Sequence, residues 1–152
     1  MTTITLEELP NYTGKHVGQS PWKNISQEMI QAFADATGDH QWIHVDVERA
    51  KNEAPWGAPV AHGFLTLSLI PQLNQSAMTV TGPAATINYG MNKVRLPAAV
   101  KSGSDIRSTI ELISVEDIDE KRVLATYKTV IEIKGEDKPA VVAENLAMYV
   151  KP

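Results

Sequence analysis

Residues 62–70 read His-Gly-Phe-Leu-Thr-Leu-Ser-Leu-Ile, a stretch that is apolar on nearly every side when it is wound as a helix. Helices of this composition are usually buried in a protein core. Pro71 is expected to kink or end the helix, although the pattern allows it to continue to about Gln75. The stretch therefore predicts a central helix that other parts of the chain must cover.

The chain beyond this helix supplies that cover as a run of strands. Apolar and polar residues alternate in four segments that are separated by turn residues. These segments are 84–96, 104–114, 121–134 and 140–150. The third is the clearest, because Val123, Ala125 and Tyr127 fall on one face. Helices followed by consecutive strands predict an α+β fold, with an antiparallel sheet curved around the helix.

Shorter elements are expected upstream of the central helix. Ser26 has the position and side chain of an N-cap for a helix that continues through Thr37. Asp46 likewise caps a short helix over 47–52. The first 25 residues contain several prolines and glycines, so we expect irregular structure there with a short strand at 16–24.

Composition limits the class of protein. The length of 152 residues predicts a single domain spanning 1–152, and 43% hydrophobic and 21% charged content is ordinary for a globular protein. The net charge of −4 comes without a dense run of Lys and Arg, which argues against nucleic-acid binding because phosphates require clustered cations. No apolar run reaches membrane-spanning length, so no membrane partner is expected.

Two absences bear on the compartment and on the chemistry. The chain has no cysteine, which excludes disulfides, thiolate catalysis and cysteine-based zinc sites and is compatible with a reducing compartment. Its first nine residues have neither the basic region nor the apolar core of a signal peptide. We therefore expect a cytoplasmic protein.

One group of residues has the side chains of a catalytic site. Residues 38–44 read Gly-Asp-His-Gln-Trp-Ile-His and are followed after a spacer by Ala-His-Gly at 61–63. Asp39 and His44 offer a carboxylate and an imidazole just after a helix, which are the parts of an acid/base pair. Gly63 opens the apolar helix, where free N–H groups can stabilise negative charge on a carbonyl oxygen. Glycine there also lets a substrate approach the backbone.

Each of these residues also has a purely structural interpretation. Asp39 alone could be a solvated loop residue after a glycine cap, and His44 alone could be a packed, hydrogen-bonded histidine. His62 is interpreted as structural and His40 as exposed. Four residues, Asp39, His44, Asp46 and His62, are of types that bind metals, but their spacing matches no standard zinc pattern, so no metal is expected.

Taken together, the residues resemble the MaoC-like hot-dog dehydratases, and most closely the NodN-like branch of the (R)-specific enoyl-CoA hydratases. The family pattern is Gly-Asp-x-Asn-Pro-x-His followed by Ala-His-Gly. In this chain Gln41 and Trp42 replace Asn and Pro, a departure that is familiar from the NodN-like branch. A second match is Ile-Asn-Tyr-Gly at 87–90 with Lys-Val-Arg-Leu-Pro-Ala-Ala-Val at 93–100. The resemblance covers about residues 15–150.

The resemblance implies a hot-dog fold, in which a five-stranded antiparallel sheet wraps around a long central helix, and a homodimer. It also implies that Asp39 and His44 form the catalytic dyad and that the N–H of Gly63 is the oxyanion donor. Further candidate substrate contacts are Asn88, Gly90, Lys93 and Arg95. Lys93, Arg95 and Lys101 could meet the phosphates of coenzyme A or could simply be solvated strand ends.

The expected function is that of an (R)-specific enoyl-CoA hydratase, which adds water to a trans-2-enoyl thioester or removes it from the 3-hydroxyacyl product. No cofactor is expected, and no glycine-rich dinucleotide loop is present. Two alternatives stay open. A hot-dog thioesterase would usually carry a lone carboxylate on the central helix, and 64–70 has none. A non-catalytic acyl-thioester-binding module would keep the fold without needing the Asp39/His44 pair.

Overall fold

The alternating pattern of the C-terminal half forms four long antiparallel strands. The computed structural model describes all 152 residues. The strands are β5 (Ala85–Arg95), β6 (Asp105–Asp117), β7 (Arg122–Ile133) and β8 (Val141–Val150). All four expected strands are confirmed, and their bounds differ from the expected ones by only a few residues. The inward face of β7 includes Val123, Ala125 and Tyr127, all buried as its pattern predicts.

The sheet has six strands where five were expected. Its order is β2-β6-β7-β8-β5, and β3 also pairs with β6. The extra strand arises because the expected strand at 16–24 is divided into β2 (His16–Gln19) and β3 (Lys23–Asn24). Pro21 lies in the break and cannot donate to a ladder. The neighbouring Ser20 keeps the edge attached, because its N–H donates to the Ser108 carbonyl and its Oγ accepts from the Ser108 N–H, both at 2.9 Å.

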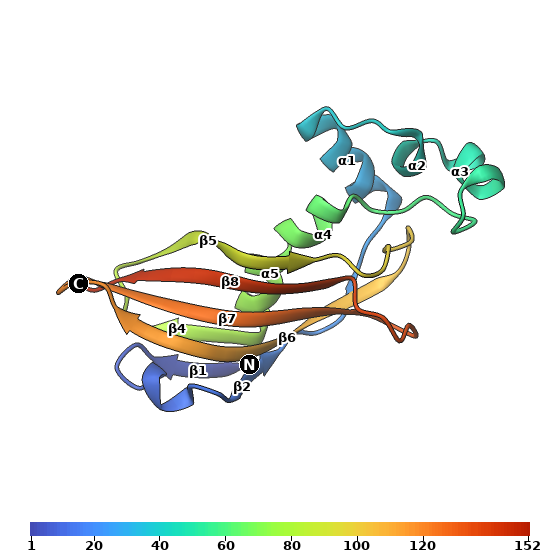
Figure 1. Ribbon diagram of the computed structural model, residues 1–152. Helices are drawn as coiled ribbons and strands as arrows, with labels where there is room; N and C mark the ends of the chain where they lie inside the picture. Colours follow the sequence, from blue (N-terminus) through green and yellow to red (C-terminus); the bar gives the residue numbers. More distant parts are fainter.

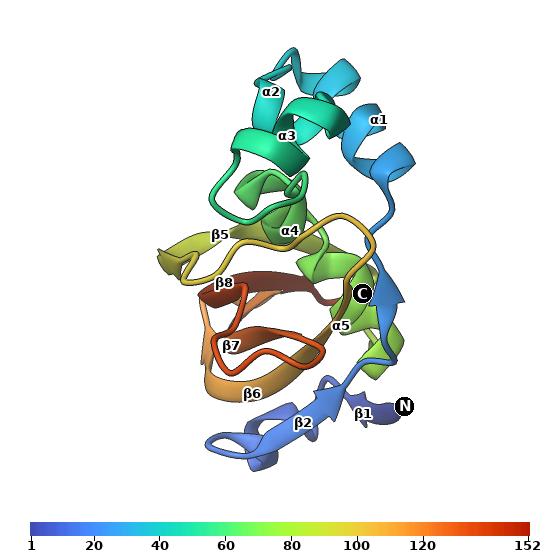
Figure 2. The same ribbon diagram turned by 90° about the vertical axis from the view of Figure 1, so that its right-hand side faces the viewer.

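The apolar stretch forms two short helices in line, α4 (Gly63–Ser68) and α5 (Ile70–Ala77). Pro71 lies in the first turn of α5, where its missing N–H removes no helical hydrogen bond. Leu65, Ile70 and Leu73 pack with sheet residues in a core of 13 buried residues. In Figures 1 and 2, α5 lies against one face of the sheet, and α4 stands past β5 on the side of α1, α2 and α3.

The expectation that this stretch is buried on nearly every side is wrong for α4. Phe64 is 74% exposed and Ser68 is also exposed. Only one side of α4 meets the sheet, so an apolar residue on the other side has nothing in this chain to cover it.

A parallel pair of strands was not expected. β1 (Thr2–Thr5) pairs in parallel with β4 (Met78–Thr81), which follows α5 directly. Between β1 and β2 lies a short 3-10 helix, η1 (Leu9–Tyr12). Ile4 and Leu9 belong to a second core of 11 buried residues, which also includes Ala77 and Met78. The first 25 residues are therefore more regular than their prolines and glycines predict.

Three helices stand beyond one end of the sheet, above the start of α4 (Figures 1 and 2). They are α1 (Gln27–Thr37), α2 (Trp42–Val45) and α3 (Val47–Glu53). Both expected caps are confirmed: Ser26 Oγ accepts from the Met29 N–H at 3.2 Å, and Asp46 Oδ1 accepts from the Arg49 N–H at 3.1 Å. No helix is long and apolar enough to cross a membrane.

Candidate active site

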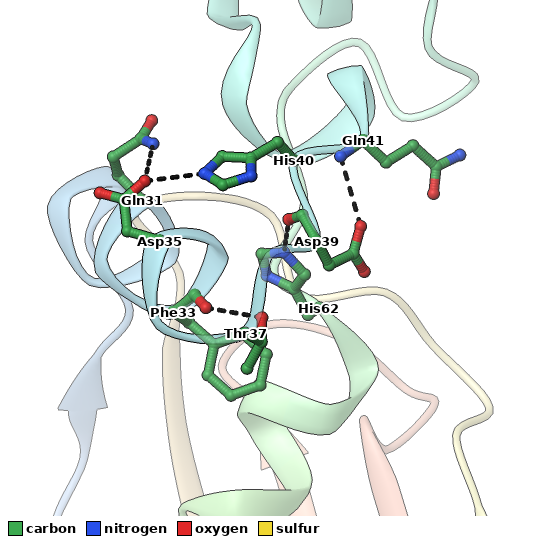
Figure 3. Close-up of polar contacts among 8 residues, drawn as sticks. All are labelled: Gln31, Phe33, Asp35, Thr37, Asp39, His40, Gln41 and His62. Carbon is green, nitrogen blue, oxygen red and sulfur yellow. Dashed lines mark hydrogen bonds and ion pairs between the residues drawn. The ribbon is translucent and has the colours of Figure 1, made fainter.

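Asp39 lies in the exposed loop between α1 and α2. Gly38 ends α1 in a left-handed conformation, with φ of 80°, which turns the chain sharply away from the helix. The Asp39 carboxylate accepts a hydrogen bond from the Gln41 N–H at 3.3 Å (Figure 3). This bond restrains the carboxylate while leaving it open to solvent.

His44 is buried in α2, with 7% of its surface exposed. Its Nδ1 lies 2.6 Å from the Val60 carbonyl oxygen, an atom that can only accept. Nδ1 therefore carries the hydrogen, and in the neutral ring Nε2 holds the free lone pair. The Gln27 side chain of α1 donates to the His44 backbone carbonyl at 2.8 Å, which ties α2 to α1. The local structure thus presents His44 as a base at Nε2.

Burial is the main cause that lowers the pKa of His44 below its ordinary value. The hydrogen bond to Val60 opposes this shift, the neighbouring His62 adds to it, and Asp39 opposes it. The net lowering keeps the His44 imidazole neutral at pH 7, as a general base must be.

His62, interpreted from sequence as structural, contacts both members of the expected dyad. It is 3% exposed and its ring stacks on His44, with centroids 3.8 Å apart and planes 22° apart. Its Nε2 donates to the backbone carbonyl of Asp39 at 2.9 Å (Figure 3). Phe33 of α1 also contacts the ring, at 4.9 Å between centroids. The Ala-His-Gly triplet was the available signal for this residue.

His40 is exposed, as expected, although it follows Asp39 directly. Its Nε2 pairs with Asp35 Oδ1 at 2.8 Å, so its ring turns toward α1 while His62 turns toward Asp39 (Figure 3). The hydrogen bond to Asp35 raises the pKa of His40. His40 therefore takes no part in the Asp39/His44 contact.

Gly63 begins α4 immediately after His62. A Cβ at Gly63 would lie 2.6 Å from Leu96 Cδ1, so the position leaves no room for a side chain unless Leu96 moves. The N–H of a first helical residue has no acceptor within its own helix. The backbone N–H of Gly63 is therefore a free donor directly after the buried His62 in the chain.

Of the four expected ligand-type side chains, three come together. Asp46 is separate because it caps α3. Asp39, His44 and His62 have side-chain ligand atoms that all lie within 4.8 Å of one another. Hydrogen bonds of ordinary length allow one water molecule to bridge atoms at this separation.

The expected substrate contacts on β5 do not join this group. Asn88 lines a cavity of about 570 Å³ between α5 and the sheet, which Asp39, His44 and Gly63 do not line. Lys93 is exposed, with its Nζ 3.7 Å from Glu144, and the exposed Arg95 donates to the Val94 carbonyl. Gly90 lies at an irregularity of the β5–β8 pairing.

Comparison with known proteins identifies the family. The model of the MaoC like domain matches residues 8–134. The 3-hydroxyacyl-thioester dehydratase Z of Mycobacterium tuberculosis is 51% identical over 149 residues, which cover 98% of each chain. The chain belongs to the MaoC-like dehydratase family. It is accordingly an enzyme of the dehydratase class, and the expected hot-dog fold is confirmed.

One further relative supports the family assignment, and one solved structure supports the fold. The nodulation protein N of Rhizobium leguminosarum bv. viciae is 40% identical over 144 residues, covering 94% of this chain and 89% of that protein. The fold matches that of the R-hydratase PhaJ1 from Pseudomonas aeruginosa with a TM-score of 0.71 at 24% identity, covering 92% of this chain and 83% of that chain. The expected likeness to NodN is confirmed by the first of these.

Proposed function

We propose that this enzyme reversibly adds water to a trans-2-enoyl-CoA to give the (R)-3-hydroxyacyl-CoA, with Asp39 and His44 as its catalytic dyad. The observation that carries the proposal is the position of an exposed carboxylate beside a buried, neutral imidazole with a free Nε2. The activity named for the 51% identical mycobacterial relative supports the substrate class.

The chemistry needs a group that can both take and return a proton. Hydration forms a bond between the water oxygen and C3, and a proton is delivered to C2. His44 Nε2 and the Asp39 carboxylate hold one water between them, accept its proton as the C3–O bond forms, and supply the proton that C2 receives. The reverse sequence removes water from the 3-hydroxyacyl thioester.

Negative charge develops on the thioester oxygen during this step, because the intermediate resembles an enolate. The N–H of Gly63 is the proposed donor to that oxygen, and one well-placed donor contributes about 3 kcal/mol to such a transition state. Because Gly63 has no side chain, the thioester can approach its backbone N–H. Lys93 and Arg95 are retained as candidate contacts for coenzyme A phosphates, since both are exposed cations on β5.

A thioesterase mechanism finds no support in the central helices. Neither α4 nor α5 contains an aspartate or a glutamate, so no carboxylate stands where a hot-dog thioesterase would need one. A non-catalytic acyl-binding role has no need of the Asp39 carboxylate beside the free Nε2 of His44.

We also propose a homodimer. β5 is the edge of the six-stranded sheet, and its unpaired backbone can accept a further strand. Ile87 and Tyr89 of this strand are 47% and 59% exposed, which is unusual for large apolar side chains. A second copy pairing along β5 would cover them.

The test follows the ultraviolet absorbance of the conjugated enoyl thioester. Purified protein is mixed with crotonyl-CoA and, separately, with a longer trans-2-enoyl-CoA. We expect rapid loss of absorbance with at least one substrate, and a loss of rate of at least about 100-fold in Asp39→Asn and in His44→Ala. Enzymes of known stereospecificity that oxidise one 3-hydroxyacyl-CoA enantiomer then assign the product.

His40→Gln is the matched control, because His40 is adjacent to Asp39 but pairs with Asp35. It should hydrate at the wild-type rate. Undiminished hydration in Asp39→Asn would refute the dyad. A folded wild-type protein that hydrates no chain length would refute the proposed reaction.

A further inference from the structure

His62 holds two separate parts of the candidate site with two separate contacts. Its ring lies parallel to His44 at 3.8 Å, and its Nε2 hydrogen is donated to the backbone of Asp39 at 2.9 Å. The first contact holds the His44 side chain of α2, and the second holds the backbone of the loop between α1 and α2. No other side chain joins these two residues by hydrogen bonding or ring stacking.

The unused nitrogen of His62 is also informative. Nδ1 is buried and has no hydrogen-bond partner. A buried nitrogen without a partner has a desolvation cost that an apolar residue of the same shape would avoid. A ring kept only for packing gains nothing from this buried nitrogen, whereas the hydrogen bond to the Asp39 carbonyl needs a side chain that carries a donor.

We infer that His62 is a positioning residue of the Asp39/His44 dyad, which holds the Asp39 loop through its backbone carbonyl and keeps the His44 ring in place by stacking. This inference rests on the proposed function for its kinetic consequence. It goes beyond it by assigning a role to the side chain that precedes Gly63.

The two contacts predict different consequences when they are removed one at a time. His62→Gln keeps an N–H donor but removes the ring. His62→Phe keeps a ring for stacking but removes the donor. Because a displacement of about 1 Å at a catalytic group can cost about 100-fold in rate, His62→Phe should lower kcat by that factor with little change in KM. His62→Gln should stay within about 10-fold of wild type.

The titration of His44 is a further readout of the contact between the two imidazole rings. The groups that face His44 are Asp39 from the preceding loop, His62 from the start of α4 and the Val60 carbonyl, while Gln27 of α1 is neutral. A second imidazole disfavours charge on His44, so its removal in His62→Gln should raise the His44 midpoint. The midpoint is measured by NMR, in a chain with four histidines to assign.

A second NMR signal reports the position of the Asp39 carboxylate and needs no substrate. The Gln41 N–H donates to the Asp39 carboxylate, so its amide resonance reports where the carboxylate lies. We expect this resonance to shift in His62→Phe and to stay close to wild type in His62→Gln. Thermal unfolding confirms that each variant is folded. If the larger ring prevents folding, His62→Leu replaces His62→Phe; it lacks both the ring and the donor, so its comparison with the ringless His62→Gln still isolates the donor.

Equal kcat values in His62→Gln and His62→Phe, or a Gln41 amide resonance that stays at its wild-type position in His62→Phe, would overturn the inference. His40→Gln should change neither kcat nor the His44 midpoint. A wild-type protein without hydratase activity would remove the proposed function alone. The Gln41 resonance would then still decide whether His62 holds the Asp39 loop.

Discussion

At the scale of the residue, His44 sets the pH at which the site can work. Burial lowers the pKa of its imidazole, and only the neutral ring offers Nε2 as a base. Lowering the pH protonates the ring, so kcat/KM should fall on the acidic side. Because the pKa is lowered, the midpoint of that fall should lie below the ordinary histidine value of about 6.5. A pH profile of kcat/KM measures it, and a midpoint clearly above that value would contradict a buried neutral base.

Gly63 allows a second prediction at this scale. In Gly63→Ala the new methyl group would meet Leu96 Cδ1, the end of a side chain that is 45% exposed and can turn away. We therefore expect a loss of less than about 1 kcal/mol in the free energy of unfolding. Activity should fall by at least about 10-fold, because the methyl group and the displaced Leu96 stand between the thioester and the backbone donor. Chemical denaturation and steady-state kinetics separate the two effects, and parallel losses would count against a substrate-facing role.

At the scale of the element, α5 should show a sharp contrast between neighbouring positions. Leu73 is 2% exposed and packs in the larger core, whereas Gln72 is exposed. Leu73→Ala should cost about 2–5 kcal/mol, from lost burial and the cavity that is left. Gln72→Ala should stay within about 0.5 kcal/mol of wild type. Urea unfolding of both variants measures the difference, and equal effects would show that α5 is not packed against the sheet as described.

Elements with a strong local pattern were predictable from the sequence, and elements that depend on distant partners were not. The four long strands and the caps at Ser26 and Asp46 follow from periodicity and side-chain chemistry. The β1–β4 pair joins four residues at the N-terminus to a strand more than 70 positions away, for which no local signal exists. In the same way, the motif indicated Asp39 and His44, but the contacts of His62 depend on how the loop before α4 meets α1 and α2.

At the scale of the whole molecule, the exposed edge of β5 predicts self-association. Ile87 and Tyr89 lie along this edge, and a charged side chain there should oppose pairing with a second copy by burying an unpaired charge. We expect wild-type protein to have twice the mass of one chain by light scattering. Ile87→Lys should shift this mass toward that of the monomer.

The matched control is Ile118→Lys, which places the same charge on a residue of similar exposure, 45% against 47% for Ile87. Ile118 follows β6 in the turn that leads to β7, and β8 separates β7 from β5 in the sheet. Ile118→Lys should leave the dimer intact. Because β5 also carries the candidate contacts Lys93 and Arg95, loss of the dimer should raise the KM for enoyl-CoA in Ile87→Lys but not in the control. A monomeric wild type, or a dimer that survives Ile87→Lys, would place any association on another surface.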